Sequence, residues 1–323
     1  MARERMLQRL HRYNKRQPEP RWGRDYQAAI RATPSEAPSI SRATILRPEL
    51  LGGREMHLLS TPETEAALLA LYHPAVWDIH EQKVLSTVPT MHPLFGHPSV
   101  DSHSLSPLLG TVNVAHRLGV LNEHPKLLVF DKNTKENEWV PFPFVGDLLL
   151  YLKDECGPYC VNWTIKLTED DFRRRGPRPL GRVRSRSPDP GAEVRHRIEA
   201  EYYWDAQIRT IPVTRPQIDH ELAANLRSIF GWHAREPGMD SAAISRMLDW
   251  YRDHLSESGT AHELTVRAAN TFNTSPYQAK IILYRGVWKR HLLVDLYVPF
   301  LIDRPLQPMQ TDPISAYNSW FER

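Results

Sequence analysis

The alternation of apolar and polar positions predicts a mixed fold for the first part of the chain. Ser60 is the predicted N-cap of a helix with an apolar stripe that runs to about Tyr72. Residues 76–82 then alternate in the manner of a half-buried strand. Two further apolar runs flank a Gly-Pro turn and are typical of a strand hairpin over residues 144–166.

Beyond the hairpin the pattern becomes mostly helical. Helices are expected at 198–207, 216–230, 241–257, 263–271 and 275–288. Further strands are expected at 127–130, 208–213 and 291–298. The last two helices and the last strand follow the order helix, tight turn, capped helix, strand, which is the outline of a winged helix-turn-helix. We therefore predict an α/β fold, a mixed sheet flanked by helices, followed by a mostly helical, winged-helix-like C-terminal domain.

Length and composition divide the chain into three parts. The 323 residues suffice for two domains, each with its own core. We expect a basic N-terminal extension at 1–54, a first domain at 55–235 and the C-terminal domain at 236–323. Within the first domain, residues 173–197 are rich in arginine and proline, which predicts a flexible insert.

Charge suggests a phosphate-bearing partner and argues against a membrane. The net charge is only +3, but arginines cluster at 1–24 and at 173–197. Clustered arginine is the electrostatic footprint of nucleic-acid binding, although a solvated basic loop explains the second cluster equally well. No apolar run approaches the ~20 residues of a membrane span. The N-terminus lacks the apolar core of a secretory signal, so we expect a cytoplasmic protein.

The predicted hairpin carries a candidate for chemistry. Asp147 opens its first apolar run and Lys166 ends its second, so the two side chains should lie close together on adjacent strands. A carboxylate inside an apolar strand costs several kcal/mol unless it is paired or binds a metal, the alternative being a solvent-facing aspartate at a strand edge. A carboxylate that holds a hard cation beside a lysine that orients water is the arrangement of a metal-dependent nuclease.

Glu63 has a simpler explanation in the pattern alone. It lies three positions after Ser60, where a capping box places its glutamate. That role stabilises a helix start by about 1 kcal/mol. Metal binding by the same carboxylate is compatible with capping.

Several short motifs, taken in order, resemble a known family. Leu58-Leu59-Ser60-Thr61-Pro62-Glu63 is followed after one helix by Val76-Trp77-Asp78-Ile79-His80-Glu81-Gln82, and later by Tyr203-Trp204 and Ile211-Pro212-Val213-Thr214. These segments resemble TnsA, the endonuclease subunit of the heteromeric transposases of Tn-seven-like elements. The resemblance covers residues 55–85 and 140–235, and the C-terminal domain more loosely.

The resemblance implies a restriction-endonuclease-like fold for residues 55–235 and an active site within it. The family's site holds a Glu from the first helix, an Asp on a strand and Gln-x-Lys on the next strand. Carried over, the catalytic residues are Glu63, Asp147 and Lys166, and the metal ligands are Glu63, Asp147 and Thr164 with one or two Mg²⁺, Mn²⁺ being the alternative. Thr164 departs from the pattern because the family has Gln there. A backbone carbonyl, a water, or an acid from the following helix, Glu199 or Glu201, would then replace that ligand.

The resemblance also implies a function and partners. The expected activity is hydrolysis of double-stranded DNA at the 5′ ends of a transposon, in a bacterial cytoplasm. The expected partners are a DDE-type transposase, TnsB, which cuts the 3′ ends, and an AAA+ ATPase, TnsC. A catalytically weakened assembly subunit that bridges these partners is the alternative, and a free-standing restriction-like nuclease is a third.

Basic residues outside the site are candidates for DNA contacts. Three follow the hairpin and four lie on or after the helix at 275–288: Arg173, Arg174, Arg175, Lys280, Arg285, Lys289 and Arg290. A solvated helix face or a surface that docks another protein explains the second group as well.

Overall fold

The computed structural model describes residues 2–18, 20–38, 42–130, 135–174 and 189–323. The chain forms two compact units, each described separately below. The first comprises residues 1–66, 75–215 and 321–323, and the second comprises residues 67–74 and 216–320. The boundary after the sheet thus falls at Pro216, whereas the sequence suggested residue 236.

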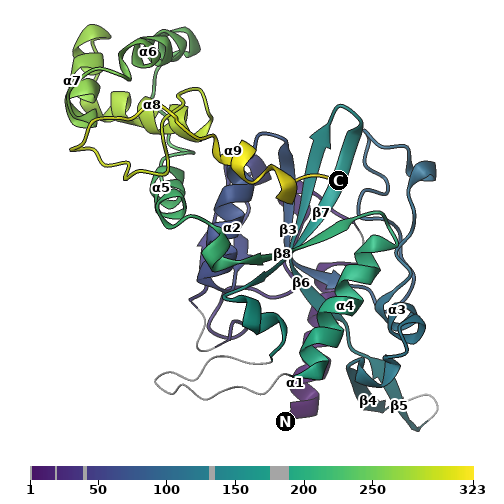
Figure 1. The fold of residues 1–323 in the computed structure, drawn as a ribbon. Coiled ribbons are helices and arrows are strands. Elements are labelled where there is room, and N and C mark those ends of the chain that lie inside the picture. Colours follow the sequence, from purple (N-terminus) through teal and green to yellow (C-terminus); the bar gives the residue numbers. More distant parts are fainter. Residues whose placement is uncertain (1, 19, 39–41, 131–134, 175–188) are drawn as a thin grey trace, which may run out of the picture. The chain divides into compact units, whose positions relative to one another are not determined.

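A mixed four-stranded sheet forms the centre of the first unit (Figure 1). Its order is β3 (Val76–Leu85), β6 (Phe144–Asp154), β7 (Gly157–Lys166) and β8 (Arg209–Thr214). The first three strands are antiparallel, and β8 runs parallel to β7. The predicted hairpin is therefore confirmed as β6–β7, and the chain has the expected α/β character.

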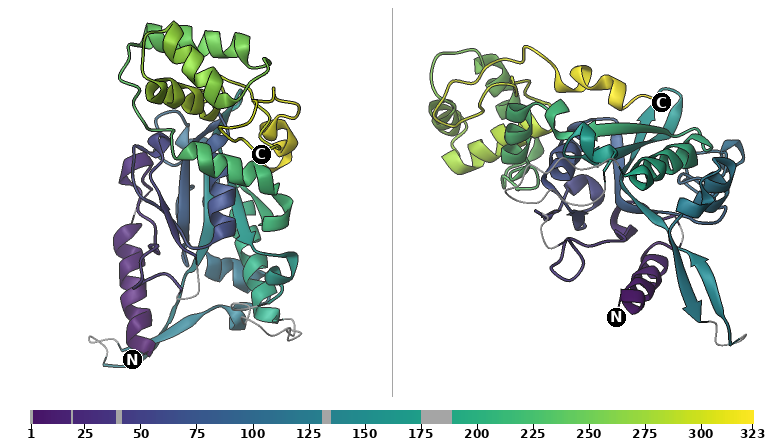
Figure 2. Two further views of the ribbon diagram at one scale, coloured as in Figure 1. Left: turned by 90° about the vertical axis from the view of Figure 1, so that its left-hand side faces the viewer. Right: turned by 60° about the horizontal axis from the view of Figure 1, so that its bottom comes forward.

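Helices and two small strand pairs surround this sheet. Their bounds are α1 (Ala2–Arg16), β1 (Thr44–Leu46), β2 (Met56–Leu58), α2 (Thr61–Tyr72), α3 (Thr111–Arg117), β4 (Lys126–Phe130), β5 (Asn137–Pro141) and α4 (Pro190–Trp204). The predicted helix after Ser60 is confirmed as α2. Helix α1 lies beside the β4–β5 pair (Figure 2), where Arg3 donates to the side chain of Asn137.

Helix α4 makes the crossover between the parallel strands β7 and β8 and covers one face of the sheet (Figure 1). Asp189 caps its first turn through a bond from the Gly191 N–H, and Pro190 fits the first helical position because no intrahelical donor is needed there. Residues 190–197 are thus helical, and their prediction as part of a flexible insert is wrong. Residues 175–188 of that insert lie outside the described residues.

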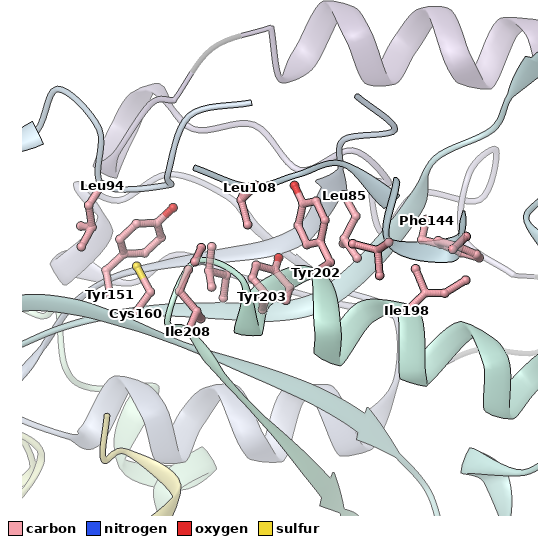
Figure 3. Packing of buried hydrophobic residues seen from close by; sticks show 14 residues of the cluster. Leu85, Leu94, Leu108, Phe144, Tyr151, Cys160, Ile198, Tyr202, Tyr203 and Ile208 are labelled. Carbon is pink, nitrogen blue, oxygen red and sulfur yellow. The ribbon is translucent and has the colours of Figure 1, made fainter. Parts of the chain in front are cut away.

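The core of the first unit lies between α4 and the sheet (Figure 3). Tyr202 and Tyr203 of α4 pack there with Tyr151 of β6 and Cys160 of β7. Burial of aromatic side chains of this size contributes ~1.5–3 kcal/mol each, and this packing fixes the register of α4 on the sheet.

The outer edge of β3 is covered by the segment that follows α1. The amide of Ala29 and the side chain of Gln17 both donate to the Gln82 carbonyl, and the Val84 amide donates to Gln17 Oε1. At the opposite edge, β8 carries Pro212, which cannot donate a ladder hydrogen bond.

The second unit is helical. Its helices are α5 (His220–Phe230), α6 (Ser241–His254), α7 (Ala261–Thr271), α8 (Pro276–Trp288) and α9 (Pro313–Ala316). Capping boxes begin α7 at Thr260 and α8 at Ser275, so the predicted helix, turn and capped helix are confirmed.

The predicted strand at 291–298 is wrong. Leu292, Val294 and Leu296 are buried in alternation, which explains the strand-like pattern. Their backbone forms only an isolated bridge, Val294↔Pro308, in which the Asp295 amide donates to the Gln307 carbonyl and the Met309 amide donates to the Leu293 carbonyl. The described residues after α8 therefore supply no wing strand.

Within the described ranges, none of the helices combines the length and apolar character that crossing a membrane takes.

Candidate functional site

The site lies where β6 and β7 stop pairing. The two strands pair from Asp154↔Gly157 to Leu148↔Trp163 and no further. Beyond that point β6 continues to pair with β3, through Gly146↔Lys83, while β7 continues to pair with β8. The strands diverge at Asp147, and side chains fill the space that a ladder would otherwise occupy.

Asp147 and Lys166 form an ion pair at this divergence. Lys166 Nζ lies 3.1 Å from Asp147 Oδ2, and the Ile165 amide donates to the same oxygen at 2.7 Å. Burial raises the pKa of Asp147, but the positive charges of Lys166 and Arg195 outweigh burial, so the pKa lies below its ordinary value. Asp147 is therefore ionised at neutral pH, and its Oδ1 accepts no hydrogen bond from the described residues.

Glu63 reaches the same place from the first turn of α2. Its carboxylate accepts bonds of 2.8 Å from the Leu59 amide and 2.8 Å from the Ser60 hydroxyl. Burial, and then the negative charge of Asp147, raise the pKa of Glu63 to about 7. Glu63 thus caps the helix, as the capping-box pattern predicted, and it also lies within the electrostatic field of Asp147.

The side chain of Thr164 is hydrogen-bonded to a buried glutamate of α4. Its hydroxyl donates to Glu199 Oε1 of α4 at 3.0 Å, and Asn162 Nδ2 donates to the same oxygen at 3.1 Å. Glu199 is 1% exposed, and burial raises its pKa above the ordinary value. Glu201 points elsewhere and is half-exposed beside Arg117. Of the two glutamates considered from the sequence, Glu199 is the one that α4 brings to the site.

A glycine makes this approach sterically feasible. A Cβ atom at Gly146 would lie 3.2 Å from Glu199 Oε1, so a larger residue would press against the buried carboxylate. Nearby, Asn162 Oδ1 is buried and has no hydrogen-bond partner among the described residues. An unsatisfied carbonyl-type oxygen next to the Glu199 carboxylate favours a cation or an ordered water there.

The sequence did not single out Gln82, which also belongs to the site. Its Nε2 donates to Glu63 Oε2 at 3.0 Å. The residue ends the Asp78–Gln82 part of the family resemblance, but glutamine in an alternating strand gives no chemical signal of its own.

The carboxylate oxygens of Asp147, Glu63 and Glu199 are chemically suited to Mg²⁺, although they do not form a complete coordination site. All are hard oxygen ligands, as Mg²⁺ prefers, and Mg²⁺ usually takes only one or two protein carboxylates and completes its shell with water and substrate phosphate. Within the described residues no group of three His, Cys, Asp or Glu side chains converges closely enough to hold a metal ion. Asp147 Oδ1, assisted by Glu63 or Glu199, is the ligand set that this chain offers.

The candidate DNA-contacting residues are placed differently from one another. Arg173 is exposed, Arg174 pairs with Asp170 at 3.4 Å, and Arg175 lies outside the described residues. In the second unit, Arg285 forms an ion pair with Glu236, and Arg290 forms one with Asp312. Lys280 lies over the ring of Trp232, and the side chain of Lys289 is exposed. The second group therefore has a structural role in addition to any contact with a partner.

No protein-family model matches the chain, and no curated protein matches it either. The functional interpretation consequently depends on the geometry above and on the motif resemblance.

Proposed function

We propose that this chain is a metal-dependent DNA endonuclease, the subunit that hydrolyses the 5′ strand at transposon ends in a cut-and-paste transposition complex. The observation that carries the proposal is the Asp147–Lys166 pair at the divergence of β6 and β7, with the carboxylates of Glu63 and Glu199 beside it. The helix, hairpin and parallel crossover strand that hold these residues support a restriction-endonuclease-like fold. The motif resemblance adds the substrate, double-stranded transposon DNA, and the partners TnsB and TnsC.

Each residue has a distinct task in this mechanism. When Mg²⁺ is bound, it polarises the phosphoryl oxygen and lowers the pKa of a bound water. Asp147, ionised at neutral pH, supplies the ligand oxygen, and Lys166 donates from its ammonium to orient the water or the phosphate. Glu63 supplies a carboxylate whose proton is lost near neutral pH. Glu199 provides the ligand oxygen that the family pattern takes from a glutamine at the position of Thr164.

The direct test removes the pair. Asp147→Ala and Lys166→Ala should each abolish Mg²⁺-dependent 5′ nicking by the reconstituted complex, because each removes a group that acts on the scissile phosphate. Lys153→Ala and Asp154→Ala, at the far end of β6 from Asp147, are the matched controls and should nick normally. Nicking that survives both site substitutions would show that the site assignment is wrong.

A second comparison tests the role of α4. Glu199→Gln keeps the shape but removes the carboxylate next to Thr164, and we expect nicking to fall by about 10- to 100-fold. Glu201→Gln, on the exposed face of the same helix, is the control. Equal activity of the two variants would exclude Glu199 from the site.

The alternative function is a weakened assembly subunit that bridges transposase, ATPase and DNA. What favours it is Thr164, which stands where the family has glutamine and whose hydroxyl donates to Glu199 Oε1 at 3.0 Å. The two functions separate in the same assay, since an assembly subunit would support transposase-dependent 3′ cleavage without any Mg²⁺-dependent 5′ nicking of its own. Nicking by the isolated chain would instead revive the free-standing nuclease.

A further inference from the structure

Gln82 has an unusual backbone conformation for its position. It lies inside β3, is 3% exposed, and has a φ of 51°, in the left-handed region that side chains with a Cβ rarely adopt. The other non-glycine residues with positive φ in the described part of the chain lie outside strands: Lys135, Gln207, Asn273 and Arg290. Such a conformation costs free energy and persists only where neighbouring contacts hold it, commonly at functional sites.

The sheet changes its alternation at this level. Phe144 and Leu149 of β6 both pack into the core between α4 and the sheet, although their residue numbers differ by an odd number. Regular alternation would place them on opposite faces. Glu81 pairs with Leu148 and Lys83 pairs with Gly146 in one continuous register, but the β3–β6 ladder leaves Gln82 and Asp147 between them unpaired.

The side chain of Gln82 joins two elements at the site. The other donors to the Glu63 carboxylate, the Leu59 amide and the Ser60 hydroxyl, are local to the start of α2. Gln82 lies on β3 of the central sheet, and its Nε2 donates to Glu63 Oε2 at 3.0 Å. This bond therefore links the Glu63 carboxylate to the strand that runs beside Asp147 of β6.

The backbone of Gln82 is held from the other side. Its carbonyl accepts from the Ala29 amide at 3.1 Å and from Gln17 Nε2 at 3.1 Å. Gln17 Oε1 also accepts from the Val84 amide at 2.9 Å, so one side chain clamps the edge of β3 on both sides of Lys83. The segment that follows the basic helix α1 therefore holds the left-handed residue in place.

We propose that Gln82 is a positioning residue that fixes the Glu63 carboxylate at the site, and that Gln17 and the Ala29 amide hold Gln82 in its left-handed conformation. The N-terminal segment is then part of the assembly of the site. The effect of Gln82 on catalysis rests on the proposed nuclease function, whereas its coupling to Glu63 does not.

A double-mutant cycle on thermal unfolding of the full chain, without metal, tests the coupling. The single variants Gln82→Ala and Glu63→Ala and the double variant are compared with the parent protein. We expect the unfolding temperature of the double variant to fall by less than the sum of the falls in the two single variants. Either single substitution already breaks the bond between the two side chains, so the second costs less in the presence of the first. Additive losses would overturn the proposal.

Two further variants separate side chain from backbone. Gln82→Gly removes the same side chain but adopts positive φ without strain, so it should unfold at a higher temperature than Gln82→Ala. Gln17→Ala should reduce the coupling between Gln82 and Glu63. Gln27→Ala, an exposed glutamine on the same segment, is the control and should leave the coupling unchanged. Gln82→Gly that is no more stable than Gln82→Ala would contradict the held conformation.

Nicking by the reconstituted complex completes the test. Gln82→Ala and Gln82→Gly should both lose about 10- to 100-fold in rate, as for residues that orient a ligand. Full activity of both variants would overturn the positioning role even if the unfolding cycle showed coupling. If the parent protein itself does not nick DNA, the proposed function fails, and the unfolding cycle alone decides whether Gln82 holds Glu63.

Discussion

At the scale of single residues, the site brings together carboxylates whose protonation differs. Lys166 and Arg195 keep Asp147 ionised, while burial and Asp147 itself favour the proton on Glu63. Carboxylates whose environments separate their pKa values can divide ligand and proton-transfer roles between them. Binding of a cation would remove the repulsion between them and favour the ionised form of both.

This difference predicts a pH dependence of stability. The pKa of Glu63 rises from 4.5 in the unfolded chain to about 7 in the folded protein, so between these values the folded state binds more protons. The contribution of the protonated Glu63 side chain to the free energy of unfolding is fully present below pH 4.5 and is lost as the pH rises through about 7. Relative to Glu63→Gln, the metal-free protein should therefore lose stability across this window.

Urea unfolding of both proteins in a chelator, at several pH values, measures the effect. The charged groups near Glu63 are Asp147 and Lys166, and both remain in the variant. A difference between the two proteins that does not change with pH would mean that Glu63 is ionised throughout.

At the scale of elements, glycines with positive φ differ in what surrounds them. At Gly110, φ is 87° and a Cβ would lie 2.5 Å from the Val88 carbonyl carbon, whereas at Gly119, φ is 71° and nothing lies within 4 Å. We expect Gly119→Ala to cost about 1 kcal/mol from backbone strain alone. Gly110→Ala should cost about 2–4 kcal/mol, because the backbone at Val88 must also move.

Denaturant unfolding of the two alanine variants checks this expectation. Equal losses of stability in the two variants would mean that the backbone near Val88 can shift without breaking nearby hydrogen bonds, such as the bond from the Thr111 amide to the Ser86 carbonyl.

What could be predicted from the sequence at this scale was local. The start of α2 and the β6–β7 hairpin depend on neighbouring residues, so their signals are complete within a short window, and the Asp147–Lys166 pair followed from them. The parallel partner of β7 could be assigned as a strand, but its pairing depends on α4 packing across the sheet. Gln82 was missed because a left-handed residue other than glycine leaves no pattern. The strand at 291–298 failed because alternation reports burial and not hydrogen-bonded pairing.

At the scale of the whole molecule, a net charge of +3 conceals a strongly basic N-terminal helix. Arg3, Arg5 and Arg9 of α1 are exposed. Replacing Arg5 and Arg9 together by alanine should weaken DNA binding and reduce the slope of log affinity against log salt by about two, at ~0.9 per phosphate contact.

Gln8→Ala, an exposed neutral position on the same helix, is the control for that measurement. Fluorescence anisotropy with duplex DNA over a salt series gives both slopes. An unchanged slope in the arginine variant would mean that α1 is a solvated helix without a phosphate partner.

The two edges of the central sheet have a consequence for self-association. Exposed strand edges allow a second copy to add its own strand and so begin aggregation. Here Gln17 and Ala29 occupy backbone groups of β3, and Pro212 interrupts the donors of β8. Copies of this chain that meet at a high local concentration would therefore associate through side-chain surfaces, and the concentration would not by itself lead to cross-β polymerisation through this sheet.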